Sequence, residues 1–182
     1  MLSPQVLGMA RRKISDWYNG ANVSEVCDGH HWYKLAHLQA IEFALQYHTS
    51  IATAAGVIAA LSPMKSWSQN MKLAADCLAG ETPRCLRSNA RTACYIRDGI
   101  AVGTVLKGRK TEAFYRAIMG DENAVVIDRW IIRAMGLPDE TRLTPKQYDT
   151  LAAIVTIEAA IAGTTPAQFQ AVVWCAIRGR SF

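Results

Sequence analysis

Proline follows a hydroxyl residue at three helix-start positions in this chain of 182 residues. The pairs are Ser3-Pro4, Thr144-Pro145 and Thr165-Pro166. A serine or threonine side chain can cap the first turn of a helix, and proline is tolerated there because that turn does not use its missing N–H. The last two pairs are followed by glutamine at the capping-box position. These signals predict a chain built from consecutive helices.

Apolar spacing extends this prediction along the chain. The first helix should end at Gly20, and Ser66 should cap a helix that runs to Gly80. We also expect helices over 32–47, 51–61, 148–161 and 169–178. In the first of these the apolar residues should point mostly inward: Leu35, Leu38, Ile41, Phe43 and Leu45. No strand series, repeat or low-complexity segment is visible, so the predicted fold class is all-α.

Length and composition favour one compact domain over residues 1–182. Two helical lobes, with a cleft near 62–67 and 106–130, are the alternative arrangement. Hydrophobic residues make up 51% of the chain, enough to fill a core. The longest apolar segments, 54–61 and 151–161, are too short or too interrupted to span a bilayer. The N-terminus lacks the pattern of a signal peptide, so we expect a cytoplasmic protein with no membrane partner.

The sequence predicts no metal and no cofactor. Its five cysteines include no C-x-x-C pair, which gives no support to a zinc ribbon or an iron–sulfur loop. A loose cluster of Asp28, His30, His31 and His37 lies in a region that we expect to be loop-like, where a solvated role is favoured over metal binding. Phosphate-binding P-loop and serine-esterase motifs do not occur.

Positive charge is concentrated between residues 84 and 116. This segment holds eight basic residues against Asp98 and Glu112: Arg84, Arg87, Arg91, Arg97, Lys107, Arg109, Lys110 and Arg116. A local excess of this size suits the backbone of a polyanion such as DNA. A solvated helix face is the alternative interpretation.

Two short motifs carry chemistry. Lys107-Gly108-Arg109-Lys110-Thr111 offers cations at a glycine-flanked helix start, where a phosphate can bind. Eighteen positions after Lys110, the run Val125-Val126-Ile127 ends in Asp128. A carboxylate that follows three apolar residues is costly to bury unless it is hydrogen-bonded or takes part in the protein's chemistry. An N-cap of the following helix and a catalytic group are both consistent with its position.

These motifs resemble the helix-hairpin-helix DNA glycosylase superfamily, the endonuclease-III-like group. Gly108-Arg109-Lys110-Thr111 is similar to the end of the family's glycine hairpin, and Ile127-Asp128-Arg129-Trp130 to its V-D-T-H segment. The stretch 133–137 is similar to the R-x-x-x-R-L-G sequence that follows the family's aspartate, and 57–62 to its apolar helix that opens onto DNA. The likeness runs from about Ser50 to Arg178.

The resemblance implies roles for individual residues. Asp128 would be the catalytic carboxylate, and Lys110 either a lyase nucleophile or a phosphate contact. Met64 stands where the family has the glutamine that fills the gap left by a flipped base, and Trp67 or Trp130 could stack on that base. The implied DNA contacts are Lys107, Gly108, Arg109, Thr111, Arg129, Arg84, Arg87, Arg91 and Met64.

Besides Met64, three departures from the family pattern are visible. Leu106 stands where the hairpin's first glycine should be, the iron–sulfur cysteines are absent, and Trp130 replaces the histidine of V-D-T-H. In a second alignment the hairpin is shortened and residues 107–110 belong to the preceding helix start. Uncharacterised phage-encoded relatives, and phage enzymes that hypermodify thymine, show a similar compressed pattern.

The expected function is that of a DNA glycosylase-like enzyme with a compact multi-helix fold. A carboxylate near the sugar can stabilise the oxocarbenium-like transition state of N-glycosidic cleavage. One alternative is a catalytically silent member of the fold that binds DNA or a protein partner, for example as a phage interference factor. Another is base hypermodification on the same scaffold.

Overall fold

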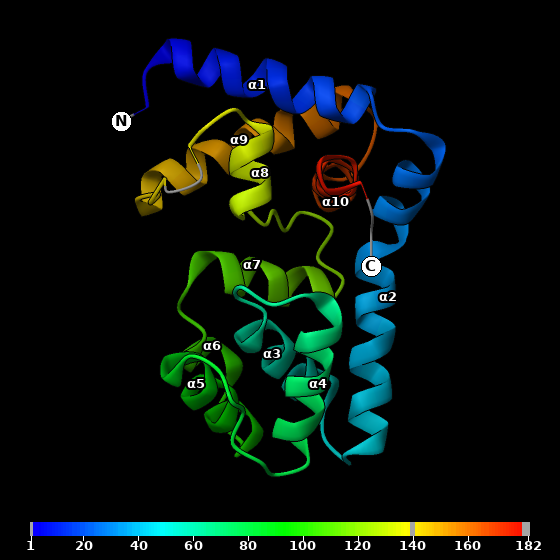
Figure 1. Ribbon diagram of the computed structural model, residues 1–182, viewed down its shortest axis with the longest axis vertical. Coiled ribbons are helices and arrows are strands. Elements are labelled where there is room, and N and C mark those ends of the chain that lie inside the picture. Colours follow the sequence, from blue (N-terminus) through cyan, green and yellow to red (C-terminus); the bar gives the residue numbers. More distant parts are fainter. Residues whose placement is uncertain (1, 139–140, 180–182) are drawn as a thin grey trace. The chain divides into compact units, whose positions relative to one another are not determined.

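All regular secondary structure in the described residues, 2–138 and 141–179 of a computed structural model, is α-helical (Figure 1). The all-α prediction is therefore confirmed. The described residues divide into two compact units: the first unit holds residues 2–33, 121–138 and 141–179, and the second unit holds residues 34–120. The helices are α1 (Pro4–Asn19), α2 (Val23–Gln46), α3 (Ile51–Leu61), α4 (Trp67–Leu78), α5 (Arg87–Arg97), α6 (Val102–Val105), α7 (Arg109–Ile118), α8 (Arg129–Ala134), α9 (Pro145–Ile161) and α10 (Pro166–Arg178).

The predicted helix caps are present. The Ser3 side chain accepts from Val6 N, and α1 ends at Gly20. Ser66 and Gln69 form a complete capping box at α4, as Thr144 and Gln147 do at α9. At α10 the box is half formed: Thr165 caps the helix, but the side chain of Gln168 accepts from Thr164 instead of returning to the cap. Both C-terminal helices begin at the proline, three residues earlier than predicted.

Helix α2 is longer than the sequence suggested, and the loop-like interpretation of residues 28–31 is wrong. The helix begins at Val23, nine residues before the predicted start. Asn22 and Glu25 exchange reciprocal hydrogen bonds, so that each side chain accepts from the other's backbone N–H. Because this cap uses asparagine and precedes a weakly periodic stretch that contains glycine, the apolar pattern alone did not reveal it.

The inward assignment of the leucines on α2 is also wrong. Leu35, Leu38 and Leu45 are exposed, and of the predicted inward residues only Phe43 is buried, while Ile41 is half-buried. The buried face of α2 consists instead of small residues and two aromatic rings: Trp32, Ala36, Ala40, Phe43 and Ala44. Small side chains allow neighbouring backbones to approach closely, so the face with the alanines packs while Leu35, Leu38 and Leu45 stay exposed.

Within the first unit α10 is the central helix and contacts α1, α8 and α9 (Figure 1). Phe169 and Val173 of α10 are buried beside Ile14, Ile131 and Leu151 from the other three helices. Tyr18 stacks on Phe169 with ring centroids 4.4 Å apart. The helices of this unit are thus held by one continuous apolar core.

Within the second unit α3 is the central helix and contacts α4, α5, α6 and α7. Every residue from Ala54 to Leu61 is buried, as expected for a helix of small residues packed on several neighbours. Among the described residues no single helix is long and apolar enough to cross a membrane. Helices α9 and α10 meet the length and composition test only as a pair, and that pair is bent by 98°.

Gly29 allows α2 and α10 to approach closely within the first unit. A Cβ atom at this position would lie 2.5 Å from the Cα of Val172 and 2.6 Å from its backbone nitrogen. Because these neighbours are backbone atoms, they cannot move aside without shifting α10. The glycine that weakened the helical pattern in the sequence is therefore required by the packing.

We predict that Gly29→Ala lowers the free energy of unfolding by about 1–3 kcal/mol, the usual cost of overpacking a core. Gly8→Ala is the matched control, because Gly8 also lies inside a helix of this unit and a Cβ there would meet nothing within 4 Å. The control should stabilise the protein by up to about 1 kcal/mol through helix propensity. Urea denaturation of both variants checks this, and equal effects would contradict the close approach.

Candidate functional site

Asp128 caps α8 and also contacts α10. Its Oδ1 accepts from the backbone N–H groups of Trp130 (2.9 Å) and Ile131 (3.0 Å), and its Oδ2 accepts from Trp174 Nε1 at 3.2 Å. The N-cap role weighed from the sequence is therefore present. The bond to Trp174, 46 positions later, was not predicted. Three N–H donors hold this half-buried carboxylate in one orientation.

The apolar run before Asp128 is a buried, non-helical segment. Residues Ala124–Ile127 are all buried, yet they form neither helix nor strand. The Tyr148 hydroxyl accepts from Ile127 N and donates to Val125 O, each at 3.0 Å. One side chain thus satisfies two buried backbone groups that would otherwise be costly. Tyr148 belongs to the site as a positioning residue that the sequence did not identify.

Arginine side chains gather on the two tryptophans beside Asp128. The guanidinium carbons of Arg133, Arg178 and Arg129 lie 4.6, 5.4 and 5.9 Å from the centre of the Trp130 ring. Arg178 is also 4.4 Å from the Trp174 ring, which packs edge-on against Trp32. These distances are in the range of cation–π attraction. We call Arg129, Arg133, Arg178, Trp130 and Trp174 the arginine–tryptophan cluster.

Tyr33 is a further polar group near Asp128. Its hydroxyl donates to Gln170 Oε1 at 2.6 Å, and Gln170 itself is buried. Burial, and then the negative charge of Asp128, raise the pKa of Tyr33 well above the usual value. The hydroxyl therefore stays protonated at neutral pH and can donate a hydrogen bond but cannot act as a base. Neither Tyr33 nor Gln170 carried a signal in the sequence.

The glycine-flanked motif lies in the second unit, whereas Asp128 lies in the first. Gly108 is the N-cap residue of α7, and Arg109 and Lys110 occupy its first turn. Thr111 donates to the carbonyl of Gly108 at 2.9 Å, and Lys107 Nζ donates to the carbonyl of Gly103 at 2.8 Å. Leu106 is buried between α6 and α7. The motif therefore begins in the short link after α6 and continues into the first turn of α7.

The cationic segment of the second unit contains both exposed and engaged arginines. Arg84, Arg87 and Arg91 are exposed, the last two on successive turns of α5. Arg97 instead pairs with Asp98 and donates to the backbone carbonyls of Cys77 and Glu81. This arginine connects α5 to the end of α4, so its role is structural.

Met64 lies on the link between α3 and α4 and is the most exposed of the large apolar side chains after Val23, at 83%. Its backbone is left-handed, with φ +62°, a conformation that costs a non-glycine residue free energy. Trp67, the other predicted pocket residue of this segment, is half-buried in the first turn of α4. Strained backbone at an exposed apolar residue is a feature that recurs at functional sites.

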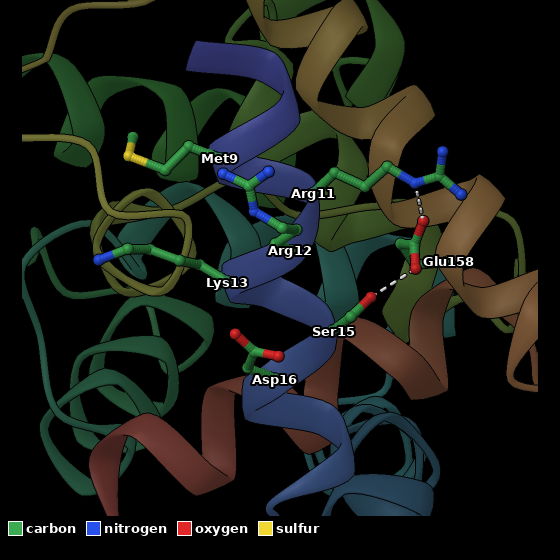
Figure 2. Close-up of a pocket in the computed structure, with 7 residues that line it drawn as sticks. All are labelled: Met9, Arg11, Arg12, Lys13, Ser15, Asp16 and Glu158. Carbon is green, nitrogen blue, oxygen red and sulfur yellow. Dashed lines mark hydrogen bonds and ion pairs between the residues drawn. The ribbon is translucent and has the colours of Figure 1, made fainter. Parts of the chain in front are cut away.

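A shallow hollow of about 580 Å³ lies on α1, with Glu158 of α9 at its edge (Figure 2). Its rim includes Met9, Arg12, Lys13 and Asp16. The buried Glu158 carboxylate pairs with Arg11 and accepts from Ser15 (Figure 2). Burial acts to raise the pKa of Glu158, but these two hydrogen bonds outweigh it and hold the pKa below its usual value. The buried charge is thus used to join α1 to α9.

The histidines give no metal geometry. His31 Nδ1 contacts the carbonyl of Cys27 one turn earlier, and His37 Nδ1 contacts the carbonyl of Ile118 at 2.7 Å. Within residues 2–138 and 141–179, no group of three histidine, cysteine or acidic side chains is placed to hold a metal ion.

We predict that Glu158→Gln destabilises the protein most at neutral pH. The pKa of Glu158 is lower in the folded protein than its usual value of 4.5 in the unfolded chain. The ionised carboxylate therefore stabilises the fold above pH 4.5, and this stabilisation is lost as the pH falls through the folded-state pKa. The difference from wild type, about 1–3 kcal/mol at pH 7, should therefore shrink below pH 4.5. Asp16→Asn, in the same hollow, is the control and should change stability by less than about 0.5 kcal/mol. A pH-independent loss in urea titrations would refute the pairing.

Comparison with known proteins identifies the family of this chain and assigns it no activity. No curated protein and no solved structure matches the chain. Residues 3–181 match a family of unknown function (DUF7178). The match covers all ten helices of the described residues, including Asp128, Lys110 and Met64. The chain therefore belongs to this family of unknown function.

Proposed function

We propose that this protein is a DNA glycosylase-like enzyme in which Asp128 acts on the sugar of an extruded base. The observation that carries the proposal is the fixed carboxylate: three N–H donors hold it at the end of a buried segment. A preoriented negative charge can stabilise the positive charge that develops on the sugar as the N-glycosidic bond breaks. The resemblance to endonuclease-III-like enzymes names the same residue.

Further support comes from the first turn of α7. No side chain caps this helix, and its first turn holds Arg109 and Lys110, cations that the helix dipole disfavours there. A DNA phosphate would accept hydrogen bonds from the N–H groups of this first turn and would be attracted by the positive charge there. In this proposal Lys107, Gly108 and Thr111 approach the same strand, and the exposed Arg84, Arg87 and Arg91 add sequence-independent affinity.

Met64 would serve as the wedge, and Trp67 as a surface for the extruded base. An exposed apolar side chain can enter a base step and unstack it, which a base must undergo before its sugar is reached. The same function is harder to assign to Trp130, because three guanidinium groups lie within 6 Å of its ring. An incoming base would have to displace them.

A catalytically silent DNA- or protein-binding protein is the second candidate. It is favoured by one observation: both oxygens of Asp128 already accept hydrogen bonds within the first unit. A carboxylate with a complete structural role does not require a chemical one. Base hypermodification on the same scaffold would use the same carboxylate and differs in its products.

The decisive measurement is base release. We expect wild-type protein to generate abasic sites in at least one DNA of a panel of damaged and phage-type modified bases, and Asp128→Asn to lose at least 100-fold in rate. The asparagine keeps an Oδ1 that can cap α8, but its NH2 group cannot accept from Trp174 Nε1. Its unfolding free energy should therefore fall by about 1–3 kcal/mol, and thermal unfolding checks that the variant is folded at the assay temperature. Asp16→Asn is the activity control. Equal product from wild type and Asp128→Asn would remove the catalytic role.

Borohydride trapping then separates the two roles of Lys110. A lyase nucleophile forms a Schiff base with the sugar, and reduction converts it to a stable protein–DNA adduct. An adduct that is lost in Lys110→Ala assigns the nucleophile. Base release without an adduct leaves Lys110 as a phosphate contact.

Met64→Gly should separate strain from function. Glycine adopts φ +62° without a steric penalty, so this variant should unfold within about 1 kcal/mol of wild type. It should nevertheless show at least tenfold weaker base extrusion, measured by 2-aminopurine fluorescence next to the target. His48→Gly is the matched control, because His48 is the other left-handed non-glycine residue of the described chain, with φ +50°. Unchanged extrusion in Met64→Gly would exclude the wedge.

A further inference from the structure

Three of the five cysteines belong to the second unit, and the proposed base chemistry uses none of them. Cys77 lies in the last turn of α4, Cys85 in the link that follows, and Cys94 on α5. All three are free thiols. Cys77 is fully buried, whereas Cys85 and Cys94 are half-buried. The unit thus combines one inaccessible thiol with two that a small reagent can approach.

Contacts between α4 and α5 bring Cys94 to Cys77. The guanidinium of Arg97 donates to the carbonyl of Cys77 at 3.3 Å and to that of Glu81 at 3.2 Å, so the last turn of α5 lies against the end of α4. Cys94 comes three positions before Arg97 and therefore lies on the same side of α5. The thiols of Cys94 and Cys77 are hydrogen-bonded to each other. The two helices therefore meet at a pair of thiols.

Packing around α3 keeps these two thiols together, because this central helix contacts both α4 and α5. Cys77 belongs to the buried face of α4, one turn after Ala74. Cys94 borders the buried face of α5, one turn after Ala90. Thiols that already meet need only small side-chain rotations to reach disulfide geometry, whereas diverging side chains need backbone movement. The folded second unit is thus prepared for a bond between these two sulfurs.

Burial and charge determine the order in which the two thiols react. Burial, and then the charge of Cys94, raise the pKa of the Cys77 thiol, while the Arg97 guanidinium acts in the opposite direction. Cys77 therefore stays protonated at neutral pH. Since a thiol must ionise and reach its target to attack, the half-buried Cys94 reacts first with a reagent from solution. Arg97 then stabilises the negative charge that Cys77 acquires when it reacts second.

We propose that Cys77 and Cys94 form a redox-active modification site, which a small-molecule disulfide oxidises to an intramolecular disulfide bond. The Cys94 thiol loses its proton to solvent and attacks one sulfur of the reagent, whose S–S bond breaks, and half of the reagent leaves as a thiolate that takes up a proton. The Cys77 thiol then loses its proton, attacks the Cys94 sulfur and releases the other half. In total, two protein thiols are oxidised, and one small disulfide is reduced to two thiols.

The bond would close the chain between the end of α4 and the middle of α5. The closed segment, 77–94, carries the exposed Arg84, Arg87 and Arg91. A cross-link of this kind lowers the entropy of the unfolded chain, so the oxidised protein should be the more stable form. The inference needs no chemistry at Asp128 and stands independently of the proposed glycosylase activity.

Peptide mapping tests which thiols pair, because trypsin separates the cysteines. Cleavage after lysine and arginine places Cys77, Cys85 and Cys94 in three different peptides: 73–84, 85–87 and 92–97. The folded, reduced protein is treated with oxidised glutathione, and the remaining thiols are blocked with N-ethylmaleimide under denaturing conditions before digestion. We expect peptides 73–84 and 92–97 to be joined in most molecules, with Cys85 blocked by the maleimide.

Thermal unfolding measures the effect of the bond on stability. Each variant is compared with its own reduced form, so that any loss of stability from the substitution itself cancels. Oxidation should raise the unfolding midpoint of wild type by roughly 5–10 °C, and dithiothreitol should reverse the rise. Cys94→Ser and Cys77→Ala should show no rise. Cys85→Ala is the matched control, because it removes the other half-buried thiol of this unit, and it should respond as wild type does.

Two results would overturn the proposal. One is the absence of the joined peptides after oxidation of the folded protein, including the case in which Cys94 carries only a glutathione adduct. The other is a bond between Cys77 and Cys94 that is no stronger in the folded protein than in the urea-unfolded chain. We expect the folded protein to hold this bond about 100-fold more strongly against reduced glutathione than the unfolded chain does.

Discussion

The hydrogen bond from Trp174 to Asp128 is the contact on which the arrangement of the first unit's polar groups depends. It joins the cap of α8 to the middle of α10 and compensates the second oxygen of a half-buried carboxylate. It also sets the Trp174 ring between Trp32 and Arg178. The orientation of the carboxylate and the placement of the arginines therefore have one origin.

Side-chain hydrogen bonds to backbone groups explain how the segment before α8 is held in place without regular secondary structure. The segment Ala124–Ile127 is buried, but it has no helical ladder to supply its hydrogen bonds. The Tyr148 hydroxyl supplies two of them, and Asp128 supplies the next two by capping α8. A sequence of side-chain contacts thus replaces regular structure over five residues, and it delivers the carboxylate at a defined position.

Structural and chemical roles of Asp128 do not exclude each other. Catalysis by a charged group benefits when its orientation is fixed before the substrate arrives, and hydrogen bonds to the surrounding fold achieve this. The same reasoning applies to the cations. Arg97 is engaged by contacts to Asp98 and to backbone carbonyls, whereas the guanidinium groups of Arg133 and Arg129 lie near the Trp130 ring. Packing therefore decides where each of these charges lies.

Local signals predicted much of the fold because helix starts are encoded in a few neighbouring residues. Ser3-Pro4, Ser66 and Thr144-Pro145 each cap a helix as expected, since a cap needs only a side chain and the N–H groups two or three positions later. The cap at Asp128 belongs to the same class. The apolar spacing does not predict the start of α2 at Val23, because no clear helical repeat of apolar residues follows the Asn22–Glu25 cap.

The sequence by itself thus determined the helical class, most helix starts and the presence of a capping carboxylate at Asp128. Only the tertiary structure decided which face of α2 is buried, because Gly29 and the alanines allow a close approach that hydrophobicity does not encode. It also decided the partners of Ile127, Asp128 and Trp130. Tyr148, Trp174 and Arg178 are 20 to 50 positions away, and contacts over that separation follow from how the helices pack rather than from any local pattern.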